Sequence, residues 1–202
     1  MGTRPTTRKP DEAERIIAAA LDLAATQGWR DSTLADIAAA AALPLAEVYR
    51  HYGSKAAILV AFSRSIDLAV LAGDDPEIAD QPPRDRLFDV IMRRFDALAP
   101  HKEALRVLVR EAGCDPLALV AGACALGRSM AWMLEAARID SSGLAGAVRI
   151  KGLALIYLST LRVWLADESE DMARTMAVLD RRLRQAEGFT AFARRRPRPA
   201  AA

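Results

Sequence analysis

Apolar residues recur every three or four positions through most of this chain, the spacing that places them along one face of an α-helix. The first such stretch is bounded by helix signals. Asp11 with Glu14 has the spacing of a capping box, and Gly28 stands where a glycine commonly ends a helix. The pattern predicts a first helix over residues 11–27.

Two short helices and a longer one are predicted next. Thr33 and Asp36 repeat the capping-box spacing and begin the second helix. Pro44 suits the start of a third helix that runs to about His51, and Ser54 caps a fourth. A long helix followed by two short ones around a tight turn is the arrangement of a helix-turn-helix.

The remaining sequence also predicts helices. They cover residues 87–98, 105–112, 116–137, 142–166 and 172–183. We therefore expect an all-α protein of about nine to ten helices.

Composition narrows the functional classes. Hydrophobic residues make up 52% of the 202 residues and aromatic residues only 5%, a balance that favours helices. The two cysteines have no CxxC spacing, so neither a metal site nor a disulfide framework is expected. No order of Ser, His and acid or paired carboxylates indicates an enzyme, and no cofactor is expected.

Membrane and secretion signals are not indicated either. The first ten residues are polar and basic, unlike a secretory signal, so a cytoplasmic location is expected. The longest apolar stretch, residues 152–166, is shorter than a membrane span and contains Arg162. We expect it to form a buried helix in which Arg162 pairs with an acid such as Asp167 or with one across a subunit interface.

The third predicted helix has the residues of a DNA-binding surface. A short helix that begins at Pro44 fits a major groove, where Tyr49, Arg50 and His51 would reach phosphates, and Lys55 adds a cation. Tyr52 is expected to turn inward. The basic arm of residues 1–10, with Arg4, Arg8 and Lys9, would follow the DNA backbone or a minor groove.

The segment "TLADIAAAAALPLAEVYRHYGSKAAIL" resembles the helix-turn-helix of TetR-type transcriptional repressors, and the resemblance extends over residues 14–62. It implies a TetR-like homodimer with an N-terminal DNA-binding domain and a variable ligand-binding body. It places Thr33, Tyr49, His51 and Lys55 at backbone-contact positions, with Leu45, Ala46 and Arg50 facing the groove and Pro44 at the head of the recognition helix.

Three features depart from that family. The turn holds Ala42 where the family usually has a glycine, Pro44 replaces a capping Ser or Thr, and Glu47 would face anionic DNA. Residues 11–60 contain four Lys or Arg and seven Asp or Glu, whereas a DNA-binding domain normally has a basic surface. The three cations of the arm bring this balance only to zero.

The body offers a candidate ligand site and a candidate dimer interface. Apolar side chains able to line a cavity for an apolar ligand are Met92, Phe95, Met130, Trp132, Met133 and Trp164, although packing in a core is the stronger alternative for such residues. Met172, Met176, Leu179 and Leu183 form a narrow stripe typical of a helix-pair seam. The resemblance implies a homodimer through the last two long helices. His101 is expected at the surface.

A second resemblance concerns the body. Residues 84–183, and above all the segment from Trp164 to "LDRRL", are similar to the lipid-binding accessory proteins of coenzyme Q (ubiquinone) biosynthesis. Those proteins share the TetR fold and no longer bind DNA. Residues 181–198 contain seven arginines and one acid with Phe189 and Phe192 between them, a composition that suits contact with an anionic membrane surface. A disordered basic tail is the alternative.

These observations give four expected regions: a basic arm (1–10), a helix-turn-helix domain (11–60), a ligand-binding and dimerisation domain (61–187) and a basic tail (188–202). The favoured hypothesis is a transcriptional regulator, a repressor, that binds an operator in double-stranded DNA and responds to an apolar small molecule. The alternative is a non-enzymatic lipid-binding or isoprenoid-binding protein of ubiquinone biosynthesis.

Overall fold

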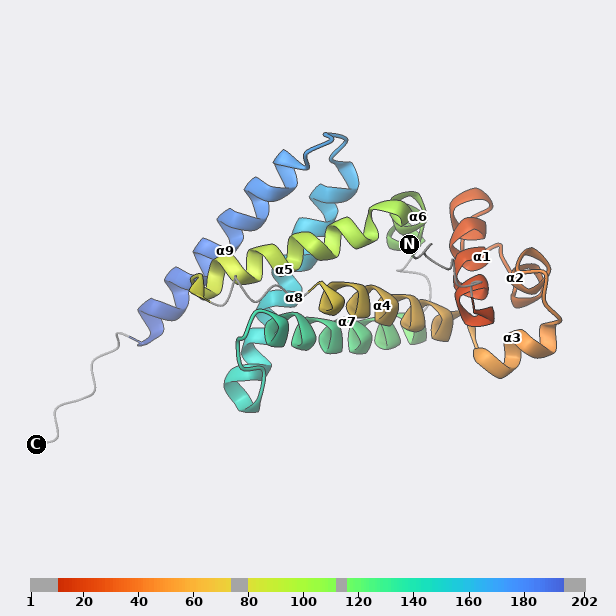
Figure 1. Ribbon diagram of the computed structural model, residues 1–202, viewed down its shortest axis with the longest axis horizontal. Helices are drawn as coiled ribbons and strands as arrows, with labels where there is room; N and C mark the ends of the chain where they lie inside the picture. Colours follow the sequence, from red (N-terminus) through yellow and green to blue (C-terminus); the bar gives the residue numbers. More distant parts are fainter. Residues whose placement is uncertain (1–10, 74–79, 112–115, 195–202) are drawn as a thin grey trace, which may run out of the picture. The chain divides into compact units, whose positions relative to one another are not determined.

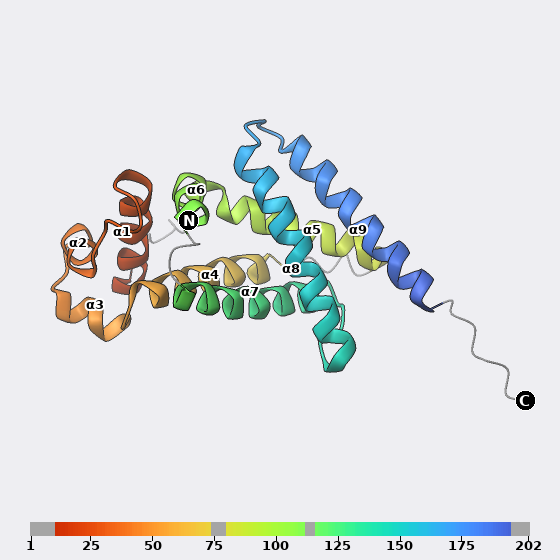
Figure 2. The same cartoon turned by 180° about the vertical axis from the view of Figure 1, so that it is seen from behind.

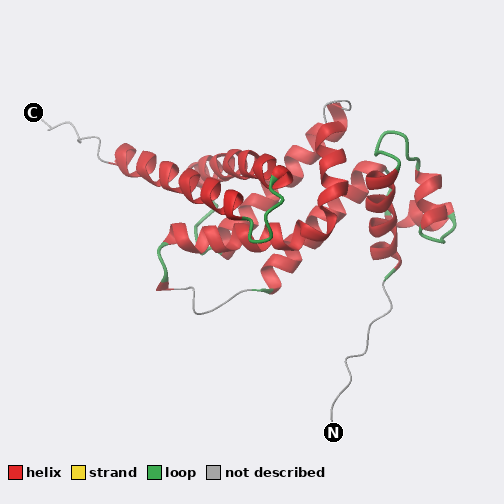
Figure 3. Ribbon diagram, turned by 90° about the horizontal axis from the view of Figure 1, so that it is seen from above, coloured by secondary structure: helices red, strands yellow, loops and turns green. Residues whose placement is uncertain are grey.

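The computed structural model describes residues 11–73, 80–111 and 116–194, with the side chains of 116–118 and 188–194 left aside. Within these ranges the regular structure is helical throughout, as Figures 1 and 3 show. A 3₁₀ turn at Ala99–His101 joins two of the α-helices. The nine α-helices of the described ranges are α1 (Glu12–Thr26), α2 (Leu34–Ala40), α3 (Leu45–His51), α4 (Lys55–Ala72), α5 (Pro83–Leu98), α6 (Lys102–Glu111), α7 (Pro116–Ala136), α8 (Gly143–Ala166) and α9 (Ala173–Arg194). The all-α expectation is confirmed.

The helix ends follow the predicted signals. Asp11 and Glu14 form the capping box of α1, Gly28 after that helix has a φ of 95°, and the Ser54 hydroxyl accepts a hydrogen bond from the Ala57 N–H at the start of α4. Thr33 and Asp36 form the capping box of α2. These local rules decide where α1, α2 and α4 begin.

The chain forms two compact units. The first, which we call the head, comprises the described residues up to Phe62 together with those of His101–Gly122. The second, which we call the body, comprises the described residues of Ser63–Pro100 and those from Ala123 onward. Helix α6 therefore lies in the head, packed against α1, although the sequence placed it within the body region 61–187.

One cluster of apolar side chains holds the head together. Ile16, Ile37, Val48 and Ile58 come from four successive helices and are almost completely buried. Tyr52 packs against the same cluster, as expected from its position one turn after Val48. His101 is half-buried rather than at the surface, because its ring packs edge-on against Phe62 with centroids 5.1 Å apart.

The body core contains stacked aromatic rings. Phe95 of α5 stacks on Tyr157 and on Trp164 of α8, with centroids 5.6 and 5.4 Å apart. Met130 and Met133 of α7 are fully buried in the body core as well. Burial of this aromatic and aliphatic surface stabilises the body.

A polar cluster is also buried in the body. The Arg94 guanidinium donates to the Asp67 carboxylate, which accepts a second hydrogen bond from the Ser129 hydroxyl at 2.5 Å. Arg94 and Ser129 are 4% and 0% exposed, and the guanidinium lies 5.4 Å from the Tyr157 ring centroid. The Nε of Arg94 has no hydrogen-bond partner among the described residues. Three helices thus bring an ion pair and a hydroxyl into an apolar interior.

Helices α8 and α9 run side by side in the body (Figure 2). α8 is long and apolar enough to cross a membrane by length and composition, but only 28% of its most apolar segment is buried inside the protein. Leu144, Val148 and Leu155 are 91%, 71% and 71% exposed on its outer face. The expectation of a buried helix over residues 152–166 is therefore wrong at Leu155 on this face, whereas the side chains on the opposite face are buried as expected: Leu153, Tyr157, Leu161 and Trp164.

Arg162 also lies exposed on α8. Asp167 is buried and accepts hydrogen bonds from Ser169 and Thr175. These hydrogen bonds, that from the Ser169 hydroxyl first, hold the pKa of Asp167 well below its usual range.

Candidate nucleic-acid interface

Helix α3 presents one face to solvent. Leu45 and Tyr49 are 50% and 75% exposed, and Ala46 and Arg50 lie exposed beside them at helical spacing. Val48, on the opposite face, is completely buried in the head core. The buried valine therefore fixes which side of this short helix faces outward.

The start of α3 is poorly capped. Pro44 occupies the N-cap position with extended backbone angles, and its side chain makes no capping hydrogen bond. A Ser or Thr at this position would accept a hydrogen bond from a backbone N–H of the first turn. Pro44 lies just before α3 rather than within it.

The turn between α2 and α3 contains a strained residue. Ala42 has a φ of 53°, a left-handed conformation that glycine adopts more easily. Its N–H donates to the Ala39 carbonyl and the Leu43 N–H donates to the Ala38 carbonyl, both at 3.0 Å, so the turn ends α2 in the way that a glycine normally would. The backbone strain expected from alanine in place of glycine at position 42 is thus present.

Arg15 stabilises this turn from α1. Its guanidinium donates to the carbonyl oxygens of Ala41 and Ala42, at 2.5 and 3.2 Å. Sequence reasoning missed Arg15, because its partners are 26 and 27 residues away and no local motif marks the contact.

Lys55 is directed into the head itself. Its ammonium donates to the backbone carbonyls of Trp29 and Ser32, the latter at 2.6 Å, and lies 4.6 Å from the centroid of the Trp29 ring. Burial lowers the pKa of Lys55, and the nearby carboxylates of Glu111 and Asp31 oppose this shift. Lys55 therefore ties the start of α4 to the segment between α1 and α2.

The other polar candidates also have partners within the head. Arg50 forms an ion pair with Glu47 at 2.9 Å, and Nε2 of His51 lies 3.4 Å from the Glu12 carboxylate. The Thr33 hydroxyl donates to the Asp36 carboxylate at 2.7 Å while remaining at the surface. Each of these side chains has to give up or share a partner if it contacts another molecule.

Of the side chains predicted to line a ligand cavity, Trp132 lines the pocket that the structure describes in the body, and the other five do not. Phe95, Met130, Met133 and Trp164 belong to the packed core, and Met92 is partly buried. The pocket is lined by residues of α4, α5 and α7 and by the turn after α7. The four buried side chains therefore pack in the core, which was the alternative interpretation of the sequence.

Comparisons with known proteins agree with this architecture. Residues 16–62 match the family of bacterial regulatory proteins named tetR, and residues 149–190 match the COQ9 family. None of the curated protein sequences gives a significant match.

Solved structures extend the similarity to most of the chain. A TetR transcriptional regulator from Nitrosomonas europaea is 27% identical, covers 87% of this chain and 98% of its own, and has a TM-score of 0.71. One from Rhodococcus sp. RHA1 is 18% identical, with coverage of 86% and 94% and a TM-score of 0.64. The FadR repressor of Thermus thermophilus, solved with lauroyl-CoA, is 23% identical, with coverage of 94% and 99% and a TM-score of 0.60.

The fold and the exposed α3 therefore define a helix-turn-helix protein. More closely, the chain has the TetR fold, with a head that matches the tetR family and a body whose last two helices are similar to COQ9.

Proposed function

We propose that this protein is a DNA-binding transcriptional regulator, a repressor that acts as a homodimer in the cytoplasm and has no catalytic activity. The observation that carries the proposal is the exposed outer face of α3 in a head that matches the tetR family. A short helix held by one buried valine and open on its other side is suited to enter a major groove.

The DNA contacts divide into two kinds. Leu45, Ala46 and Arg50 face the bases, where Leu45 and Ala46 offer apolar contact to a thymine methyl group and Arg50 offers donors to guanine. Thr33, Pro44, Tyr49 and His51 lie along the phosphate backbone, and Lys55 supports them by fixing the start of α4.

Charge sets the expected strength of binding. Glu47 neutralises part of the Arg50 charge, and the head carries more acids than bases over residues 11–60. Arg4, Arg8 and Lys9 of the basic arm lie outside the described residues; we propose that they add phosphate contacts. Binding should therefore be moderate in affinity and depend strongly on salt.

The homodimer uses the last two long helices. The outer face of α8 exposes the apolar side chains of Leu144, Val148 and Leu155 at helical spacing. A second copy packing there would bury the stripe in an isologous interface. Such a dimer would present two α3 helices to the two half-sites of an operator.

The effector is an apolar small molecule bound by the body, which weakens DNA binding. Support comes from the FadR structure, which holds lauroyl-CoA, and from the methionine and aromatic side chains of the body core. Met92, Phe95, Met130, Met133 and Trp164 would separate to admit such a ligand.

A salt-titrated gel shift tests the proposal. The DNA lies upstream of the protein's own gene, and the variants are Tyr49→Ala on α3 and Leu68→Ala, an exposed apolar residue in the body, as the control. Wild type and Leu68→Ala should retard the DNA at low salt and lose affinity as salt rises, whereas Tyr49→Ala should bind about tenfold more weakly. No retardation of any DNA at low salt would overturn the proposal.

The match of residues 149–190 to COQ9 favours a second candidate, a lipid-binding or isoprenoid-binding protein of ubiquinone biosynthesis. The arginine-rich end of the chain would then contact a membrane surface. α9 continues through Arg194, and residues 195–202 lie outside the described part of the chain. Mass spectrometry of lipids extracted from the purified protein tests this candidate, since a co-purified isoprenoid without DNA binding would favour it over the regulator.

A further inference from the structure

The body carries a pocket of about 260 Å³ on its surface. Its apolar part comes from Val70 and Leu71 in the last turn of α4 and from Ala136 at the end of α7. Trp132, one turn earlier on α7, adds an indole that is 55% exposed. An exposed tryptophan beside aliphatic side chains offers a flat apolar surface to a ligand.

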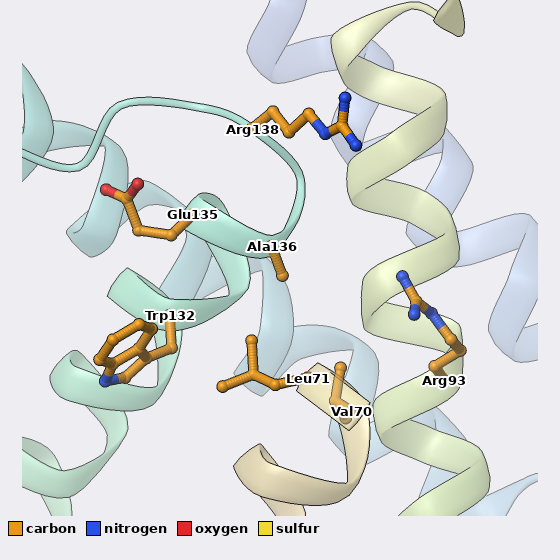
Figure 4. A pocket seen from close by; sticks show the side chains of 7 residues that line it. All are labelled: Val70, Leu71, Arg93, Trp132, Glu135, Ala136 and Arg138. Carbon is orange, nitrogen blue, oxygen red and sulfur yellow. The ribbon is translucent and has the colours of Figure 1, made fainter. Parts of the chain in front are cut away.

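Two arginines stand at the same pocket. Figure 4 shows Arg93 and Arg138 on one side of it and Trp132 on the other. Arg93 already donates to the Gly73 carbonyl, and the Asp89 carboxylate, one turn away on α5, offsets part of its charge. The Arg138 guanidinium has no hydrogen bond or ion pair with any described residue, and Arg138 is exposed.

The acidic residue of the pocket is engaged elsewhere. The Glu135 carboxylate accepts hydrogen bonds from the Ser141 N–H at 3.0 Å and from its hydroxyl at 2.6 Å. It points away from the two guanidinium groups in Figure 4. Arg138 is therefore the cation that is left for a ligand.

The backbone at Arg138 is unusual for an arginine. Its φ is 56°, and its N–H and that of Ile139 donate to the carbonyls of Glu135 and Leu134, both at 2.8 Å. Glycine is the usual residue at this position after a helix, because a side chain strains the left-handed backbone. The chain keeps an arginine here at a conformational cost, and the guanidinium lines the pocket.

We propose that this pocket binds an organic carboxylate with a flat apolar body, which is held by the Arg138 guanidinium and stacks on Trp132. A guanidinium forms paired hydrogen bonds with a carboxylate, and the indole and the aliphatic side chains cover the apolar part. This site goes beyond the proposed function, because its lining contains none of the core side chains proposed for the apolar effector. Binding there requires no DNA binding.

Isothermal titration calorimetry on the full-length protein tests the site with two isosteric probes, 2-naphthoate and the neutral 2-naphthamide. The test variant is Arg138→Gly, which removes the guanidinium and relieves the strained backbone. Met172→Gly is the matched control, because Met172 has a φ of 51° but does not line the pocket. Thermal unfolding of each variant shows that it folds.

Wild type and Met172→Gly should bind naphthoate at least about tenfold more tightly than naphthamide, since the charge-assisted pair is available only to the carboxylate. Arg138→Gly should abolish this preference without a lower melting temperature, and Trp132→Ala should weaken binding of both probes. Equal affinity for the two probes, no binding of either, or an unchanged preference in Arg138→Gly would overturn the proposal. These outcomes are independent of the gel shift, so failure of one proposal is distinguishable from failure of the other.

Discussion

The head and the body place polar and apolar side chains in different ways. In the head, α3 buries Val48 and turns Tyr49 and Arg50 to solvent, so the polar and aromatic groups form the outer surface. In the body, Asp67 and Arg94 lie inside while α8 exposes a row of leucine and valine side chains. The head thus buries its apolar side chains and presents a polar and aromatic surface suited to binding. One copy of the body, by contrast, exposes an apolar face and holds an ion pair in its core.

The largest expected effect concerns the ion pair in the body. Asp67→Ala should lower the free energy of unfolding by about 3–5 kcal/mol, because it leaves the buried Arg94 charge without its partner. The double variant with Asp67→Leu and Arg94→Leu should recover most of this loss, because no charge remains buried. Urea unfolding followed by circular dichroism measures both, and a loss below about 1 kcal/mol in the single variant would show that the pair is dispensable.

The apolar face of α8 is tested by Leu155→Glu. Loss of one buried apolar side chain from an interface costs about 2 kcal/mol of binding free energy, and a symmetric dimer loses it on both subunits. The dimer Kd should therefore rise about a thousandfold. Analytical ultracentrifugation measures it. Leu68→Glu is the control, because Leu68 is exposed to a similar extent on α4. If both variants remain dimers, the interface lies elsewhere.

Within the head, variants of Lys55 and Arg50 distinguish a cation that stabilises the fold from a cation proposed to contact DNA. Lys55→Met should lower the free energy of unfolding by about 1–3 kcal/mol, since two backbone carbonyls lose their donor. Arg50→Gln, on the exposed face of α3, should change it by less than about 0.5 kcal/mol but weaken DNA binding. Equal stability losses in the two variants would contradict this division.

The smallest expected effect is a gain at the strained turn. Ala42→Gly should stabilise the protein by about 1 kcal/mol, because glycine adopts a φ of 53° more easily than alanine. Ala41→Gly, one residue earlier at a φ of −72°, should instead destabilise it by a similar amount. Thermal and urea unfolding of the pair checks the opposite signs.

The sequence was most informative where structure depends on near neighbours. The capping boxes at Asp11 and Thr33 and the inward position of Tyr52 depend on residues within one or two turns, and the structure has them as predicted. The strain at Ala42 was foreseeable because the helix-turn-helix resemblance fixed the geometry of its turn.

Contacts between segments far apart in the chain could not be predicted from the spacing of nearby residues. Arg15 contacts the α2–α3 turn, Lys55 contacts carbonyls near Trp29, and Asp67 meets Ser129 62 residues later. No local spacing marks these pairs. The exposure of α8 was missed because an apolar helix that covers its own core and one that awaits a partner have the same composition.

The most direct test of the central claim, that the exposed face of α3 reads DNA, is selection of bound sequences from a random duplex pool by the full-length protein. The account predicts enrichment of an inverted repeat with half-sites about one helical turn apart, lost when Tyr49→Ala protein is used. A pool that stays random after repeated rounds at low salt would contradict it.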